Sequence, residues 1–211
     1  MHAFQRSSLT GLAAAAIALA LAGCAGPHGP HGPQGTPGAH EHGHGGPGAG
    51  PGGGGPMGMM MKGRMGAASL SPTQGNAVRG LIVFHEMDGR LMVHAKVSGL
   101  KPNAEHGFHV HETGSCASTD GSSAGGHFNP DGKPHGPQGA PHHAGDLPAL
   151  RADAAGVADQ KFTVSGVTLA EGATSLLGRS VIVHAMPDDY TTQPTGNSGA
   201  RVACGVIAVH Q

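Results

Sequence analysis

The sequence is poor in aromatic residues: among its 211 residues there are one tyrosine, five phenylalanines and no tryptophan. Aromatic side chains normally supply much of the apolar area that a core buries. A core built here must therefore be small and aliphatic, and small cores usually need cross-links or bound metal for stability. Cysteines and metal-binding side chains are thus the features to look for in this chain.

Charge is scarce as well. Only 12% of residues are charged, and the formal net charge is −1 with neutral histidines. Proteins that bind nucleic acid usually carry a basic patch, so this composition argues against a nucleic-acid partner. No run of like charges indicates a charged macromolecular partner either. The charge composition therefore gives no indication of a nucleic-acid or acidic partner.

The N-terminus resembles a bacterial lipoprotein signal. One arginine precedes an apolar run at residues 12–22, which is shorter than the roughly 20 residues that a membrane span requires. The run ends in LAGC, which resembles a lipobox and implies cleavage after residues 1–23 and lipidation of Cys24. Ala25 after the cysteine favours the outer membrane, so we expect an anchored protein on the periplasmic side of the envelope. The alternative is an ordinary cleaved signal with an incidental cysteine.

Residues 24–66 are rich in glycine, proline, histidine and methionine and have almost no branched aliphatic side chains. Such a segment cannot bury enough apolar surface to offset its ordering entropy, so we expect a disordered tether. It is either a spacer of biased composition or a metal-scavenging arm, because imidazoles bind Cu(II) and Zn(II) and thioethers favour Cu(I). The side chains in question are His28, His31, His40, His42, His44, Met57, Met59, Met60, Met61 and Met65.

From residue 67 to 211 short apolar alternations are separated by glycine-rich turns, which is typical of an all-β sandwich or barrel. The Asp-Gly pair in MDGR predicts a hairpin. Strands are expected near Ala77–His85, Arg90–Ser98, Glu105–Val110, Val157–Val164, Ser180–His184 and Val202–Val209. The long connection from 112 to 146 is rich in histidine, and loops of that length are usually functional or disordered.

Seventeen histidines are the strongest compositional signal. In EHGFHVHETGSC, His109 and His111 are two apart and share one face of a strand. In the following loop, three histidines spaced by eight residues precede an aspartate, a plausible closed zinc site; these are His127, His135, His143 and Asp146. His184 ends an apolar strand and could complete a second, copper-binding set.

These motifs together resemble the copper/zinc superoxide dismutases, specifically their exported bacterial branch. The resemblance runs from about Ser69 to the C-terminus and is carried by GFHVHE, GGHFNP, HHAGDLP, VIVHAMPDD and GNSGARVACGVI. It implies an eight-stranded Greek-key β-barrel or sandwich with long metal-binding and active-site loops. It also implies conversion of two superoxide anions and two protons to dioxygen and hydrogen peroxide by copper redox cycling, which would protect the envelope from external superoxide.

The resemblance assigns roles by position. One copper per subunit would be bound by His109, His111, His127 and His184, and one zinc by His127, His135, His143 and Asp146, with His127 bridging both metals. The remaining roles are a carboxylate that orients ligands of both metals (Asp188), a guanidinium beside the copper (Arg201), a channel residue (Thr195) and a disulfide (Cys116 and Cys204). The disulfide agrees with the cysteine count, since lipidation of Cys24 leaves two cysteines for an oxidising compartment.

Some points stay open at this level. The loop from Met186 to Ala200 has no basic residue, so electrostatic steering beyond Arg201 would need another source such as Lys133. The spacing before Asp146 favours His143 over His142 as the ligand. Relatives of this kind are monomers or homodimers, and the sequence favours neither. The competing function is a non-enzymatic copper/zinc-buffering lipoprotein; a zinc hydrolase would need an open zinc position, which four protein ligands do not leave.

Overall fold

The computed structural model describes residues 63–210, and its regular structure is almost entirely β-strand. The all-β prediction is confirmed. Within these residues the helical structure is the 3-10 turn η1 (Ser122–Ala124), and no helix is long and apolar enough to cross a bilayer. The expected signal peptide, Cys24 and all but the end of the expected tether lie outside the described residues. The strands are β1 (Arg64–Pro72), β2 (Arg79–Met87), β3 (Arg90–Ser98), β4 (Glu105–His106), β5 (Phe108–His111), β6 (Leu150–Arg151), β7 (Ala158–Val164), β8 (Ser180–His184), β9 (Arg201–Val206) and β10 (Ala208–Val209).

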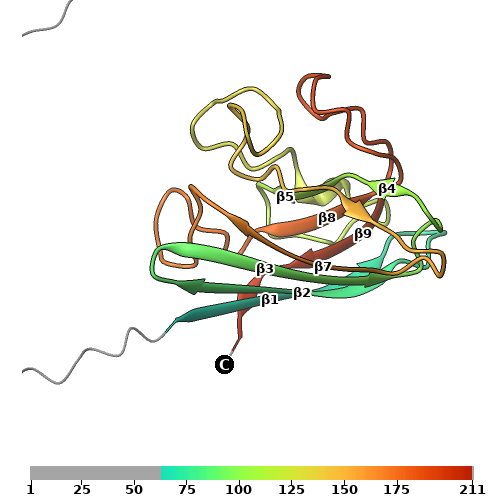
Figure 1. Ribbon diagram of the computed structural model, residues 1–211, viewed down its shortest axis with the longest axis horizontal. Helices are drawn as coiled ribbons and strands as arrows, with labels where there is room; N and C mark the ends of the chain where they lie inside the picture. Colours follow the sequence, from blue (N-terminus) through green and yellow to red (C-terminus); the bar gives the residue numbers. More distant parts are fainter. Residues whose placement is uncertain (1–62, 211) are drawn as a thin grey trace, which may run out of the picture. The chain divides into compact units, whose positions relative to one another are not determined.

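The main sheet has eight antiparallel strands with the path β5-β8-β9-β1-β2-β3-β7, and β10 pairs with β1 (Figure 1). A short second sheet joins β4 to β6. Strands β1, β2 and β3 are neighbours, but later connections cross between the two halves of the sheet: the chain leaves β3 for β4 and β5, returns to β7 beside β3, and crosses again to β8 beside β5. These crossings, rather than successive hairpins, are those expected of a Greek-key barrel.

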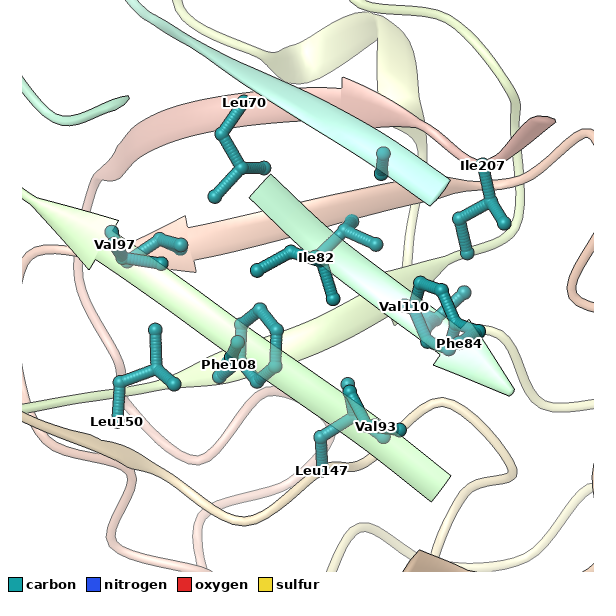
Figure 2. Packing of buried hydrophobic residues seen from close by; sticks show 14 of the residues in the cluster. Leu70, Ile82, Phe84, Val93, Val97, Phe108, Val110, Leu147, Leu150 and Ile207 are labelled. Carbon is teal, nitrogen blue, oxygen red and sulfur yellow. The ribbon is translucent and has the colours of Figure 1, made fainter. Parts of the chain in front are cut away.

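The sheet curls around one main core that is largely aliphatic, as the scarcity of aromatics predicts, although it includes Phe84, Phe108 and Phe128. On β2 and β3 the inward residues alternate with exposed or half-buried ones, so each strand contributes one face to the interior. Figure 2 shows side chains from both halves of the sheet meeting there. The labelled members of this core are Leu70, Ile82, Phe84, Val93, Val97, Phe108, Val110, Leu147, Leu150 and Ile207.

The Asp-Gly hairpin between β2 and β3 is confirmed. Asp88 and Gly89 have φ of 52° and 71°, and the flanking pair Met87 and Arg90 closes the ladder. Positive φ at both central positions matches the right-handed twist of the strands, and asparagine, aspartate and glycine tolerate it best.

The sequence prediction missed the first strand, β1, whose first three residues fall in the segment assigned to the tether. The inward residues of β1 include Gly66 and Ala68, which are too small to produce a clear apolar alternation. The prediction also merged β9 and β10. The ladder breaks at Ile207, whose backbone instead exchanges hydrogen bonds with Gly178 and Arg179.

Two long loops rise from the side of the sheet that carries β5 and β8 (Figure 1). One follows β5 and contains η1; the other joins β8 to β9. The first is anchored by isolated bridges between His111 and His127 and between His109 and Asp146. The histidine-rich connection therefore pairs with β5 at two points along its length.

Candidate metal centre

The alternation of β5 places His109 and His111 on the same face, away from the core. Phe108 and Val110 fill the interior, while the two histidines are 0% and 1% exposed on the opposite side. Burying two imidazoles outside the apolar core is costly unless their nitrogens are satisfied. The loops that cover this face supply the partners.

Four histidines converge on one point. Ligand nitrogens of His109, His111, His127 and His184 all lie within 4.8 Å of one another, although they come from β5, the loop after it and β8. Each ring leaves one buried nitrogen without a hydrogen-bond partner: Nδ1 of His109 and Nε2 of His111, His127 and His184. Buried polar atoms are rarely left unpaired, so four unpaired nitrogens that face one another fit a bound metal ion.

The opposite nitrogen of three of these rings is held in place. His109 donates from Nε2 to Asp188 over 2.6 Å, and His111 donates from Nδ1 to the carbonyl of Gly125 over 2.9 Å. His184 donates from Nδ1 to the carbonyl of Gly199 over 3.1 Å. These hydrogen bonds select the tautomer whose free nitrogen faces the other rings, as in most histidine–metal sites.

A second set shares His127 with the first. Nδ1 of His127, His135 and His143 lie 2.9, 3.0 and 3.3 Å from Oδ1 of Asp146, and the Nδ1 atoms of His127 and His143 are 3.4 Å apart. In a tetrahedral site with zinc–nitrogen bonds of 2.0–2.1 Å, ligand atoms are about 3.3 Å apart. Three imidazoles and one carboxylate therefore have the chemistry and the spacing of a closed zinc site.

His127 is the only member common to the two four-residue sets among the described residues. Its Nε2 belongs to the four-imidazole set and its Nδ1 to the set with Asp146. An imidazole that presents one nitrogen to each set is what a bridging ligand requires. The position expected of the bridge is thus the position where the two sets meet.

Asp188 connects the sets a second time. Its Oδ2 accepts from His109 over 2.6 Å and its Oδ1 accepts from His135 over 2.9 Å. Burial acts to raise the pKa of Asp188, but the hydrogen bonds from these two rings outweigh it and hold the pKa below its ordinary value. The carboxylate therefore stays ionised and orients one ring of each set.

Burial keeps the imidazoles neutral. Loss of hydration is the largest cause, and neighbouring charges such as that of His127 add to it; together they outweigh the hydrogen bonds of these rings, which act to raise the pKa. The pKa falls to about 4 for His109, about 3 for His184 and about 2 for His111. Only a neutral imidazole can bind a metal, so these rings need not lose a proton before binding at neutral pH.

Arg201 is held beside the four-imidazole set. Its Nη1 donates to the carbonyl of Gly121 and its Nη2 to that of Gly125, each over 2.7 Å. The Gly125 carbonyl also accepts from His111, so the guanidinium and one ring share an acceptor. The positive charge of Arg201 contributes to the lowered pKa of both His111 and His184. The loop carrying both glycines is tied to β9 by a disulfide between Cys116 and Cys204, with Cα atoms 5.7 Å apart.

Of the other residues considered in the sequence analysis, one joins the cluster and two lie at the surface. His143, not His142, joins the cluster, as the spacing predicted; Nδ1 of His142 instead donates to Ala140. Thr195 is exposed, and its channel role stays a prediction. Lys133 pairs with Asp131 over 3.0 Å, and its steering role also stays a prediction.

Sequence reasoning missed Gln193 and Gly196, which join the two loops. The amide of Gln193 accepts from the backbone N–H of His135 over 2.8 Å and donates to the His135 carbonyl over 2.9 Å. Gly196 has φ +63°, and a β-carbon there would overlap Oδ1 of Asp188 and Nε2 of His135. No local pattern signals either role, because both depend on a partner more than fifty residues away.

Replacing Asp188 with asparagine is expected to weaken binding of both metals, by about 10- to 100-fold each, because an amide cannot accept from both rings. The measurement is competition of each metal against a chelator of known affinity. Asp189→Asn is the matched control. This neighbour is exposed, and its carboxylate accepts hydrogen bonds from Thr191 and Thr192 of its own loop rather than from a histidine. Equal losses in both variants, or a loss for one metal alone, would contradict the connecting role.

The comparisons with known proteins agree with this geometry. Residues 78–207 match the family described as copper/zinc superoxide dismutase (SODC). The chain is 41% identical over 139 residues to the superoxide dismutase-like protein YojM of Bacillus subtilis, covering 64% of this chain and 71% of that one. It is 40% identical over 145 residues to Superoxide dismutase (Cu-Zn) 2 of Aquifex aeolicus, covering 66% of this chain and 84% of that one.

A solved structure gives the same result. A crystal structure of a double mutant of a SOD-like protein from Bacillus subtilis superposes with a TM-score of 0.62 at 43% identity, covering 67% of this chain and 96% of that chain. The family match extends over more than half of this chain and includes the residues of both histidine sets. On these grounds, the chain belongs to the copper/zinc superoxide dismutase family.

Proposed function

We propose that this chain is an active superoxide dismutase that converts two superoxide anions and two protons to dioxygen and hydrogen peroxide. The observation that carries the proposal is the convergence of four unpaired ring nitrogens from His109, His111, His127 and His184. A substituted or collapsed set would favour a protein without turnover, but all four positions hold histidine and all four rings are buried.

Copper bound by these four residues would supply one-electron oxidation and reduction, chemistry that no side chain of this site offers. Zinc bound by His127, His135, His143 and Asp146 has no redox chemistry and would fix the loop and the bridging ring. Both metals are part of the proposal, at one of each per subunit. The donor sets suit the two metals, since imidazoles bind copper well and a closed set with a carboxylate suits zinc.

His127 is the residue placed to move a proton. Its Nε2 faces the copper set with no hydrogen-bond partner, while its Nδ1 is held at the zinc set. A proton taken up at Nε2 would lie beside the position where reduced substrate needs one. The zinc set keeps the ring in place while that nitrogen changes its protonation.

Arg201 is the residue placed to attract the substrate. Superoxide is a small anion. Two carbonyls already fix the guanidinium, so its side chain loses little conformational entropy when the anion binds. We propose that Arg201 positions superoxide next to His111 and that Thr195 flanks the approach. Such a charge in a recess raises the encounter rate, and the effect falls as salt screens it.

The cellular setting belongs to the same proposal. The signal-like N-terminus, the LAGC motif and Cys24 support export and lipid anchoring on the periplasmic side of the envelope. A disulfide between Cys116 and Cys204 agrees with an oxidising compartment. Globomycin, which blocks lipoprotein signal processing, should cause the unprocessed form to accumulate, and a Cys24→Ser variant should be released from membranes.

Superoxide decay after pulse radiolysis tests the reaction. The mature chain is compared as metal-free, zinc-loaded and copper/zinc-loaded protein, with EDTA present so that free copper does not contribute. Only the copper-containing form should accelerate decay. If superoxide decays at the same rate with all three forms although copper stays bound, the dismutase proposal fails and the metal-buffering alternative replaces it.

A further inference from the structure

A row of soft side chains crosses the outer face of the sheet, on strands that take no part in the metal centre. Met65 on β1 is directly opposite His85 on β2, and His85 is directly opposite Met92 on β3. Directly opposed residues of antiparallel strands have β-carbons about 5 Å apart on the same face. The register therefore places one imidazole between two thioethers.

The row is accessible. Met65 and Met92 are 40% and 42% exposed, and Met87, two residues along from His85, is 50% exposed. A hollow of about 500 Å³ is lined by His85, Met87, Asp88, Arg90, Met92 and Thr163. Three of its lining residues are thus potential soft ligands that solvent can reach.

The backbone beside the row leaves room for the imidazole. A β-carbon at Gly63 would lie 2.7 Å from Nε2 of His85, so a side chain at that position would displace the ring. Methionine has three rotatable side-chain bonds and adapts its sulfur position readily. Both neighbours of His85 can therefore turn their sulfur atoms toward the ring without movement of the strands.

The donor set selects for a soft, singly charged ion. Thioethers favour Cu(I), and imidazole binds copper as well, whereas Mg²⁺ and Ca²⁺ require oxygen ligands. Met65, His85 and Met92 bring no charge, so a monovalent ion leaves little excess charge at the surface. The formal charges of Asp88 and Arg90 in the hollow offset each other.

We propose that Met65, His85 and Met92, with Met87 at the edge of the hollow, form a binding site for a cuprous ion. The site shares no residue with the two histidine sets, which lie on β5, β8 and the loops (Figure 1). It holds copper in the reduced form, outside the buried centre. Because it needs no turnover at the centre, it stands or falls independently of the dismutase proposal.

Silver(I), a redox-inert ion with the same ligand preference, tests the site. The probe is added to full-length mature protein whose centre already holds zinc and reduced copper, and the ε-methyl groups of ¹³C-labelled methionines are followed by NMR. Signals of Met65 and Met92 should shift together with the first equivalent of silver. Methionine-to-leucine variants assign them and keep the volume at exposed positions, so the fold is retained.

Two variants decide the outcome. His85→Asn should weaken silver binding at Met65 and Met92 at least tenfold. His94→Asn is the matched control, because His94 lies on the same outer face of β3 but is paired with Asp159 over 2.7 Å; it should change binding less than twofold. Unshifted Met65 and Met92 signals overturn the proposal, as does equal weakening in both variants. Shifts confined to Met57, Met59, Met60 and Met61 would place the binding in the N-terminal segment and overturn it too.

Discussion

A His111→Ala variant is expected to lose at least about 100-fold in dismutation rate while it keeps its zinc. Removing one of four imidazoles leaves the copper set incomplete. Even the loss of a residue that only supports a ligand lowers metal affinity or activity by about 10- to 100-fold. The zinc set contains no contribution from His111 and should bind as before. The substitution also removes the hydrogen bond from His111 to Gly125, so the carbonyl shared with Arg201 loses one of its donors.

The measurement combines metal content by mass spectrometry with superoxide decay at equal protein concentration. His142→Ala is the matched control, since this histidine adjoins the zinc set but belongs to neither set; its activity should stay within twofold of the original. Thermal unfolding of both variants shows whether the fold is kept. A His111→Ala protein that holds copper and retains full activity would refute the four-imidazole assignment.

Removing the disulfide is expected to lower the free energy of unfolding by about 4.6 kcal/mol. Cys116 and Cys204 are 88 residues apart, and the loop-entropy estimate for a cross-link of that span gives this value. For a domain of this size the change corresponds to a fall in Tm of roughly 10–18 °C. The rate should also fall, because the loop that supplies the Gly121 and Gly125 carbonyls to Arg201 is no longer anchored to β9.

The variant for this test replaces both Cys116 and Cys204 by serine, so that no unpaired thiol remains at either position. Denaturant unfolding of the original protein with and without reductant should reproduce the difference, and reductant should not change the stability of the double variant. If the double variant lies within about 1 kcal/mol of the original protein, the bond contributes little to stability. If it keeps the full rate, Arg201 does not depend on the anchored loop.

The sequence was most informative where a role depends on residues close together along the chain. The period of a strand placed His109 and His111 on one face, and the requirement for positive φ marked the Asp88-Gly89 hairpin. The spacing before Asp146 favoured His143 over His142, and His143 is the one that lies in the cluster with Asp146. It was least informative at β1, where small inward residues leave no apolar alternation to recognise.

The sequence by itself determined which ligand types this protein has and which of them share a strand or a turn, because backbone geometry repeats over a few residues. The family resemblance assigned a bridging role to His127 and an orienting role to Asp188, but only the tertiary structure places the two nitrogens of His127 in different sets and a ring of each set against Asp188. The same is true of the methionine–histidine row, which three strands create through their register. These features arise because the fold brings together residues that are tens of positions apart in the sequence. No local pattern specifies which of their atoms will meet.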